Sequence, residues 1–168
     1  METINFFKDE EKIEEKCFGL CDDFDEQAKT PAYCSINLEE KENWIATVSN
    51  KTDNSIAFIA VDNKIELRRA NGEMDYRCDA MLHNEDYIVF VELKNQRENW
   101  IKHAVEDQLL STINAFKNAQ DITQFKHKVA YACNKKQPKF AVSHKQYMND
   151  FKRKNNVRLI ISNEITLK

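Results

Sequence analysis

Three charged residues stand near the ends of two strand-like runs, and their types suit metal-dependent hydrolysis. The run YIVFVELK, which ends at Lys94, is rich in β-branched and aromatic residues and is typical of a buried strand. Because side chains alternate along a strand, Glu92 and Lys94 project from one face about 7 Å apart. Residues 74–82 also favour a strand, and the polar residues 83–86 form a turn, so a hairpin would bring Asp79 near Glu92. Two carboxylates offer the oxygen ligands that Mg²⁺ prefers, and a lysine can steady a water molecule or a developing negative charge.

This arrangement resembles the signature of the PD-(D/E)xK nuclease superfamily, an acidic residue on one strand followed by (D/E)-x-K on the next. Asp79 takes the first place, and Glu92-Leu93-Lys94 takes the second. The chain departs from the motif at Cys78, which stands where the family name has proline. The alternative interpretation of the same residues is a salt-bridged strand end, in which Asp79 is simply exposed.

The resemblance implies a Mg²⁺ or Mn²⁺ site and a role for each matching residue. Asp79 and Glu92, with the backbone carbonyl of Leu93, would hold the metal. Lys94 would orient the attacking water or stabilise the charge on phosphorus. Gln108 would point at the metal from the following helix, as in similar proteins, or it is a partly buried glutamine without a function. Similar proteins often recruit a further acid from a first helix, and the sequence leaves four candidates open: Glu11, Glu14, Glu15 and Glu26.

The fold class implied by the resemblance, which covers residues 55–133, is α/β with a restriction-endonuclease-like αβββαβ core. This core is a mixed central sheet flanked by helices, here with an appended C-terminal helix and strand. The apolar spacing predicts helices over residues 5–27, 99–119 and 143–154. Ser143 is the expected N-cap of the last helix. Strand-like runs occupy residues 43–49, 55–61, 74–82, 87–94, 128–133 and 157–162.

The length and composition of the chain predict a single cytoplasmic domain over residues 1–168. A chain of 168 residues is long enough to bury a core without metals or disulfides. No apolar run approaches the roughly 20 residues that a membrane span requires, and the acidic N-terminus lacks a signal-peptide pattern. The five cysteines match no metal-cluster spacing, and we expect free, buried thiols.

The net charge of −3 hides an asymmetry between the two parts of the chain. Residues 1–67 hold 7 lysines and no arginine against 16 acidic residues, whereas residues 68–168 hold 18 basic and 12 acidic residues. Between Lys126 and Arg158 there are ten basic residues and one acid, Asp150. This basic region is the expected DNA-binding surface, because phosphate neutralisation supplies most nonspecific affinity. The acidic N-terminal half could instead meet a basic protein, or both charged faces could simply be solvated.

These features favour a metal-dependent nuclease that hydrolyses DNA phosphodiester bonds in a bacterial defence, restriction or repair context. The alternative is a binding module with a nuclease fold, such as an immunity protein that neutralises a toxin. The acidic N-terminal half would suit that role, because charge complementarity mainly speeds association. The complete Asp79, Glu92 and Lys94 set favours the enzyme, since an inhibitor does not need it.

Overall fold

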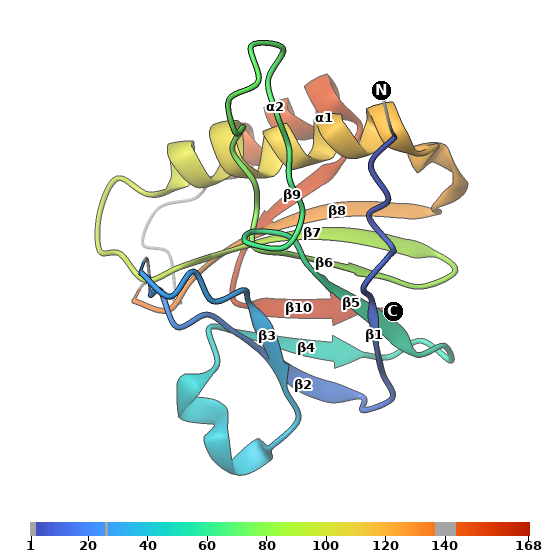
Figure 1. Cartoon of the computed structure of the whole chain (residues 1–168). Helices are drawn as coiled ribbons and strands as arrows, with labels where there is room; N and C mark the ends of the chain where they lie inside the picture. Colours follow the sequence, from blue (N-terminus) through green and yellow to red (C-terminus); the bar gives the residue numbers. More distant parts are fainter. Residues whose placement is uncertain (1–2, 26, 137–143) are drawn as a thin grey trace.

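The computed structural model, which describes residues 3–25, 27–136 and 144–168, has three layers. Helices cover one face of a six-stranded sheet, and a four-stranded sheet covers its other face (Figure 1). The strand order is β1-β5-β6-β7-β8-β9 in the large sheet and β10-β4-β2-β3 in the small one. The chain is therefore of the mixed α/β class. None of the helices in the described ranges is both long and apolar enough to cross a membrane.

The elements have the following bounds. The large sheet consists of β1 (Glu11–Ile13), β5 (Ile56–Ala60), β6 (Ala80–His83), β7 (Tyr87–Lys94), β8 (His127–Asn134) and β9 (Arg158–Ile161). The small sheet consists of β2 (Cys17–Cys21), β3 (Tyr33–Ser35), β4 (Ala46–Asn50) and β10 (Glu164–Leu167). The helices are the short η1 (Leu38–Asn43) and η3 (Ile122–Gln124), the π-helical η2 (His103–Leu109), α1 (Leu110–Ala119) and α2 (Lys145–Asn155).

Strand β7 lies at the centre of the large sheet and occupies the residues that the sequence predicted. It pairs antiparallel with β6 and parallel with β8, and β5 extends the antiparallel side. Ile88 and Phe90 point toward the helices, whereas Val89 and Val91 point toward the small sheet. All four are fully buried, because layers cover both faces of the strand. A strand of this kind carries a continuous apolar run.

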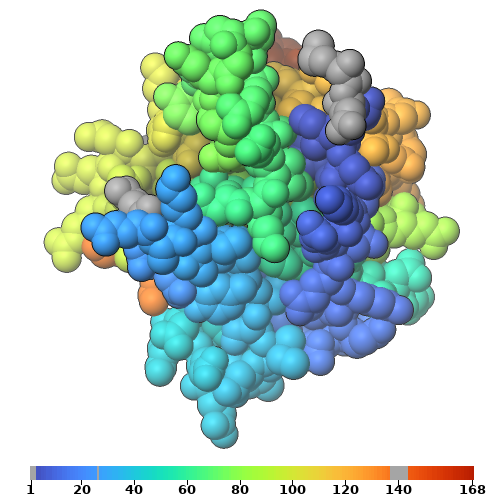
Figure 2. Space-filling view, viewed as in Figure 1, coloured from blue at the N-terminus to red at the C-terminus, as the bar shows by residue number. Residues whose placement is uncertain are grey.

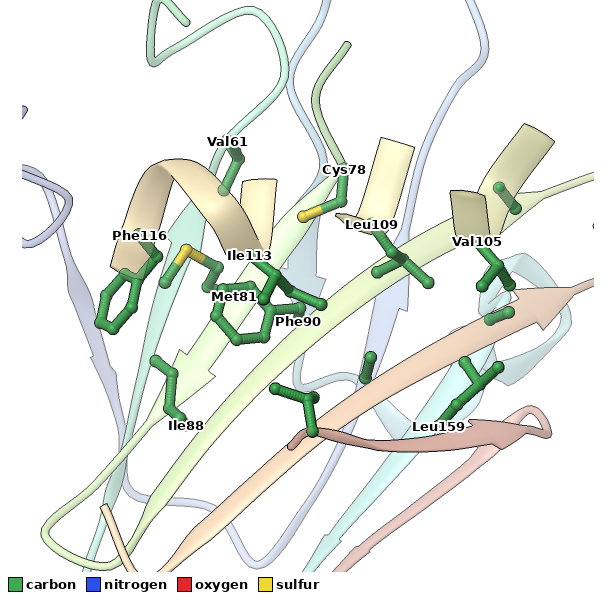
Figure 3. Packing of buried hydrophobic residues seen from close by; sticks show 14 of the residues in the cluster. Val61, Cys78, Met81, Ile88, Phe90, Val105, Leu109, Ile113, Phe116 and Leu159 are labelled. Carbon is green, nitrogen blue, oxygen red and sulfur yellow. The ribbon is translucent and has the colours of Figure 1, made fainter. Parts of the chain in front are cut away.

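The core between the large sheet and the helices is formed by side chains that come from both layers. Met81 and Phe90 project from the sheet toward Leu109, Ile113 and Phe116 of the helix (Figure 3). All of them are fully buried. The helix predicted over residues 99–119 is present as η2 followed directly by α1. Its apolar stripe therefore packs on the sheet as its spacing indicated.

The prediction of a helix over residues 5–27 is wrong, because this segment forms strands β1 and β2. Phe18 and Leu20 are fully buried against the large sheet, whereas Gly19 lies on the opposite face of β2. A Cβ atom at Gly19 would overlap the ring of Trp44, so this position requires glycine. The helical spacing of the apolar residues in this segment was a coincidence. The continuous apolar run CFGLC is instead typical of a buried strand. A sheet, rather than a helix, consequently covers this face.

Other predicted elements need smaller corrections. Of the strand expected over residues 74–82, only residues 80–82 join the sheet, and β6 continues to His83, which was expected in the turn. Met74 forms an isolated bridge with Arg68. The strands expected over residues 43–49 and 55–61 exist as β4 and β5 but belong to different sheets. The last strand is β10, which was not predicted and pairs parallel with β4. The expected N-cap Ser143 lies outside the described residues. All five cysteines are free, as expected.

Candidate functional site

Several charged side chains meet at one end of the large sheet. Strands β5, β7 and β8 all run toward this end, and β6 starts from it. Asp62 therefore follows the end of β5, Asp79 directly precedes β6, and Glu92 and Lys94 close β7. The topology brings together residues that are up to 32 positions apart in the sequence.

Asp79 and Glu92 face each other on adjacent strands. Ala80 pairs with Val91, and one further step along the hairpin brings Asp79 to Glu92. Both side chains lie on the face that carries Met81 and Phe90, the face toward the helices, since residues two apart share a face. Their carboxyl groups lie close enough for each to shift the pKa of the other. The Asp79 Oδ2 atom also accepts a hydrogen bond of 2.7 Å from the backbone N–H of Leu93.

Lys94 forms an ion pair with Glu92 on the same face, with 3.4 Å between Nζ and Oε1. The Glu92 side chain is only 2% exposed, and that of Lys94 is 15% exposed. This pair agrees with the salt-bridge interpretation of the sequence as well as with a catalytic one. Asp79, however, is buried and not exposed, which is where the simple strand-end interpretation fails.

Burial changes the protonation of the two carboxyl groups. It raises the pKa of Asp79 to about 7, although the hydrogen bonds from Glu92 and Leu93 oppose the shift. Burial, followed by the proximity of Asp79, holds the pKa of Glu92 well above its usual range, and Lys94 only partly offsets this. Two buried carboxyl groups in contact do not both ionise readily, so the pair retains a proton near neutral pH.

A cavity of ≈ 600 Å³ opens beside this pair. Its walls include Asp22, Asp62, Arg77 and Gln108 as well as Asp79, Glu92, Leu93 and Lys94. Asp22 reaches Asp79 from the end of β2 in the small sheet, and burial raises its pKa. Arg77 forms an ion pair of 3.1 Å with Asp62. The site therefore draws acidic residues from both sheets.

The acids that complete this cluster were not among those proposed from the sequence. Glu11, Glu14 and Glu15 are exposed and do not line the cavity, and Glu26 lies outside the described residues. Their choice depended on a first helix that does not form. Asp22 and Asp62 each directly follow a buried apolar run, Cys17–Cys21 and residues 56–61. A charged residue at the end of a buried strand is therefore the signal that would have found them.

Two buried acceptor atoms in the walls of this cavity suggest where a cation would bind. Among the described residues, Glu92 Oε2 and Gln108 Oε1 are buried without a hydrogen-bond donor. An unsatisfied buried acceptor costs about 1–3 kcal/mol, so such groups call for an explanation. Within residues 3–25, 27–136 and 144–168, no group of three or more His, Cys, Asp or Glu is already arranged around one metal position. Asp79, Glu92 and a backbone carbonyl nevertheless fit Mg²⁺, which usually keeps several of its waters.

Thr112 ties the helix to the segment that carries Asp79. Its Oγ1 atom accepts a hydrogen bond of 2.8 Å from the N–H of Cys78 and donates one of 3.1 Å to the carbonyl of Gln108. Gln108 lies in the π-helical η2, and π-helical turns are frequent at functional sites. The positions of Asp79 and Gln108 are therefore coupled through one buried hydroxyl group.

The basic residues that the structure describes between Lys126 and Arg158 do not form one surface beside this site. Lys128 pairs with Ile88 at the start of β7, about 20 Å from the end of the strand. The basic last turn of α2 also lies at that far end, because it leads into the start of β9. Lys135, whose N–H bonds the carbonyl of Lys94 at 2.8 Å, lies at the site, and Lys136 follows it. Both side chains are exposed.

Comparison with known proteins gives no relative for this chain. No protein-family model matches it, and no curated protein or solved structure matches it significantly. What the protein does must therefore be argued from the site itself.

Proposed function

We propose that this protein is a metal-dependent nuclease that hydrolyses phosphodiester bonds in DNA. The observation that carries the proposal is the juxtaposition of the buried Asp79 and Glu92 at one end of the β6–β7 hairpin, with Lys94 on the same face at the wall of a cavity. A structural ion pair does not require a second buried carboxyl group or an open cavity beside it. Buried groups with perturbed pKa values in a cavity are typical of functional sites.

The residues of the cavity are of the types that hold Mg²⁺ or Mn²⁺. Asp79, Glu92 and the carbonyl of Leu93 would be the protein ligands, with water molecules completing the shell. When bound, the metal lowers the pKa of a coordinated water and neutralises charge on the scissile phosphate. Gln108 Oε1, which is buried without a donor among the described residues, would accept a hydrogen bond from a coordinated water.

The side chains of the protein would divide the remaining work. Lys94 would orient the attacking water or stabilise the negative charge that grows on the phosphate oxygens. Glu92 must be ionised to hold the metal. The positive charges of Lys94 and of the bound metal both favour its ionised form. Lys135 and Lys136 are placed to contact the DNA backbone beside the cavity. Asp22 would either bind a coordinated water or help to hold the metal.

The order of the elements also supports the proposal. The succession β5, β6, β7, helix, β8 follows the βββαβ order of the PD-(D/E)xK core. Asp79 directly precedes the second of these strands, and Glu92-Leu93-Lys94 ends the third. The leading helix of that core is replaced by β1 and β2. The site residues do not depend on this replacement, because all of them except Asp22 come from the β5–β8 unit.

The proposal is tested by cleavage of supercoiled plasmid and of single-stranded oligonucleotides with MgCl₂, MnCl₂ or EDTA. We expect metal-dependent cleavage, lost on Lys94→Ala by at least about 100-fold, the usual cost of removing one transition-state donor. Lys64→Ala, which removes an exposed lysine outside the cavity, is the matched control. Circular dichroism would show that each variant is folded. If Lys94→Ala cleaved DNA as fast as the wild type, the activity would come from another site of the protein or from a contaminating nuclease.

A protein-binding role, such as neutralising a toxin, remains the second candidate. The observation that favours it is a group of exposed apolar side chains within the acidic N-terminal part of the chain. This role would be favoured over catalysis if no substrate were cleaved and if added metal left the DNA affinity unchanged.

A further inference from the structure

Four exposed apolar side chains lie within fifteen residues of the chain. The described residues include five exposed large hydrophobic side chains, and four of them are Phe24, Tyr33, Ile36 and Leu38, between 39% and 56% exposed. The fifth, Tyr76, belongs to the arm between β5 and β6. Single exposed apolar residues are ordinary, but clustered ones mark interaction sites.

These four side chains come from one stretch of the chain, and two of them line the same hollow. Tyr33 donates a hydrogen bond of 3.1 Å to Asp23, beside Phe24, and both aromatic residues line a hollow of ≈ 330 Å³. Ile36 directly follows β3, and Leu38 is the first residue of η1. Figure 2 shows the part of the chain coloured light blue to cyan at the lower left of this face of the molecule. We call Phe24, Tyr33, Ile36 and Leu38 with their neighbours the β3 surface.

Two backbone features distinguish the β3 surface. Strand β3 is the terminal strand of the small sheet, and within the described chain only β2 pairs with it. Its outer N–H and C=O groups can therefore pair with an added polypeptide. Phe24 adopts a φ of 56°, which is uncommon for a bulky residue and costs free energy. The free edge is only three residues long, so side-chain contacts would supply most of the affinity.

The charge around the β3 surface selects the kind of partner. The apolar side chains lie among three exposed lysines, Lys29, Lys41 and Lys135, and five exposed acids: Asp23, Asp25, Glu39, Glu40 and Glu42. An acidic rim repels nucleic acid and anionic membranes alike, whereas it attracts a cationic polypeptide. An apolar centre with a charged rim is the usual composition of a protein interface.

We infer that the β3 surface binds a lysine- or arginine-rich segment of another protein that also carries apolar side chains. The apolar side chains of the segment would pack on Ile36 and Leu38, and its cations would face Glu39 and Glu40. Phe24 lines both the hollow at this surface and the cavity that contains Asp79. A bound segment would therefore lie next to the entrance of the candidate site. The inference does not depend on the nuclease proposal.

Selection from a phage-displayed library of random twelve-residue peptides tests this inference. The full chain is the target, and the double variant Ile36→Ser/Leu38→Ser removes nonspecific binders beforehand. We expect the enriched peptides to carry a net positive charge and apolar residues. A synthetic enriched peptide should bind the wild type in fluorescence anisotropy at least tenfold more tightly than Ile36→Ser/Leu38→Ser or Glu39→Lys/Glu40→Lys. Its affinity should fall as salt is raised, since exposed charge pairs are screened.

Matched controls alter the same chemistry elsewhere on the surface. Tyr76→Ser removes an exposed aromatic side chain, and Glu14→Lys/Glu85→Lys reverses two exposed acids outside the β3 surface. These variants should bind the peptide as the wild type does. Enrichment of acidic peptides or of none, or equal binding by Ile36→Ser/Leu38→Ser, overturns the inference. Concentration-dependent self-association of the wild type that Ile36→Ser/Leu38→Ser abolishes would also overturn it, because the occupant would then be a second copy.

Discussion

The backbone N–H of Leu93 donates a hydrogen bond of 2.7 Å to the Oδ2 atom of Asp79, across the end of the β6–β7 hairpin. This bond fixes one carboxylate oxygen of Asp79 against the neighbouring strand, beside Glu92. The two acids are therefore held together by the sheet itself and not by flexible loops. Functional groups held by sheet backbone are positioned more accurately than groups on loops.

Metal affinity should rise with pH through about 7, because the metal must displace the proton that the acid pair retains. The pKa of Asp79 is raised to about 7, so below this pH the proton competes with the cation. We expect the affinity for Mn²⁺ to increase by up to about tenfold per pH unit for each displaced proton between pH 6 and pH 7. Isothermal titration calorimetry in buffers of different ionisation enthalpy measures both the affinity and the protons released.

Asp79→Asn should abolish this metal binding, whereas Asp53→Asn, at an exposed acid outside the cavity, should leave it unchanged. A metal affinity independent of pH in the wild type would show that the Asp79 and Glu92 pair is not the site.

The free energy of unfolding without metal should decrease as pH rises from 5 to 8. The folded-state pKa of Asp79 lies above its value in the unfolded chain, so its contribution to stability is fully present below the unfolded pKa and is lost as pH rises through about 7. Asp79→Asn cannot ionise and retains an acceptor for the Leu93 N–H. Urea unfolding in EDTA should therefore show a smaller decrease for this variant, and an equal decrease in both proteins would contradict the burial argument.

Thr112→Val should destabilise the protein by about 1–3 kcal/mol, because the buried N–H of Cys78 would lose its acceptor. Valine has nearly the same volume, so the packing of the helix should be kept. The same change should lower cleavage more than unfolding explains, since Asp79 and Gln108 are no longer coupled. Thr123→Val, at an exposed position in η3, is the control. Denaturant unfolding and cleavage at a temperature well below the transition separate the two effects.

Lys135→Glu/Lys136→Glu should weaken DNA binding, whereas Lys152→Glu/Lys154→Glu should change it little. The first pair lies at the sheet end that carries the site, and the second lies at the far end on α2. Each lost phosphate contact should make the slope of log affinity against log salt shallower by about 0.9 on duplex DNA. Fluorescence anisotropy with Ca²⁺, chosen to allow binding while suppressing cleavage, measures this. If Lys152→Glu/Lys154→Glu reduced DNA affinity more than Lys135→Glu/Lys136→Glu does, the DNA-binding surface would include the far end of the sheet, as the sequence predicted.

The sequence by itself determined strand β7 and the hairpin that brings Asp79 to Glu92. The run ending at Lys94 is continuously apolar because both of its faces are buried, and such a run is visible without knowledge of its partners. The approach of Asp79 depends on a four-residue polar turn, which is a local feature. The helix that carries Gln108 was likewise visible in its apolar spacing.

Only the tertiary structure decided how residues from distant segments meet this hairpin. The first 27 residues have apolar spacings that fit a helix, yet Phe18 and Leu20 are buried by a sheet that also recruits β10 from the other end of the chain. Asp22 reaches Asp79 for that reason, and no local pattern contains this pairing. The basic residues from Lys126 to Arg158 form one region of the sequence. Those that the structure describes nevertheless lie at both ends of the sheet, because β8 and α2 run in opposite directions. The periodicity of apolar residues indicates which face of a helix or strand is buried. Which element covers that face is decided by contacts between residues far apart in the chain.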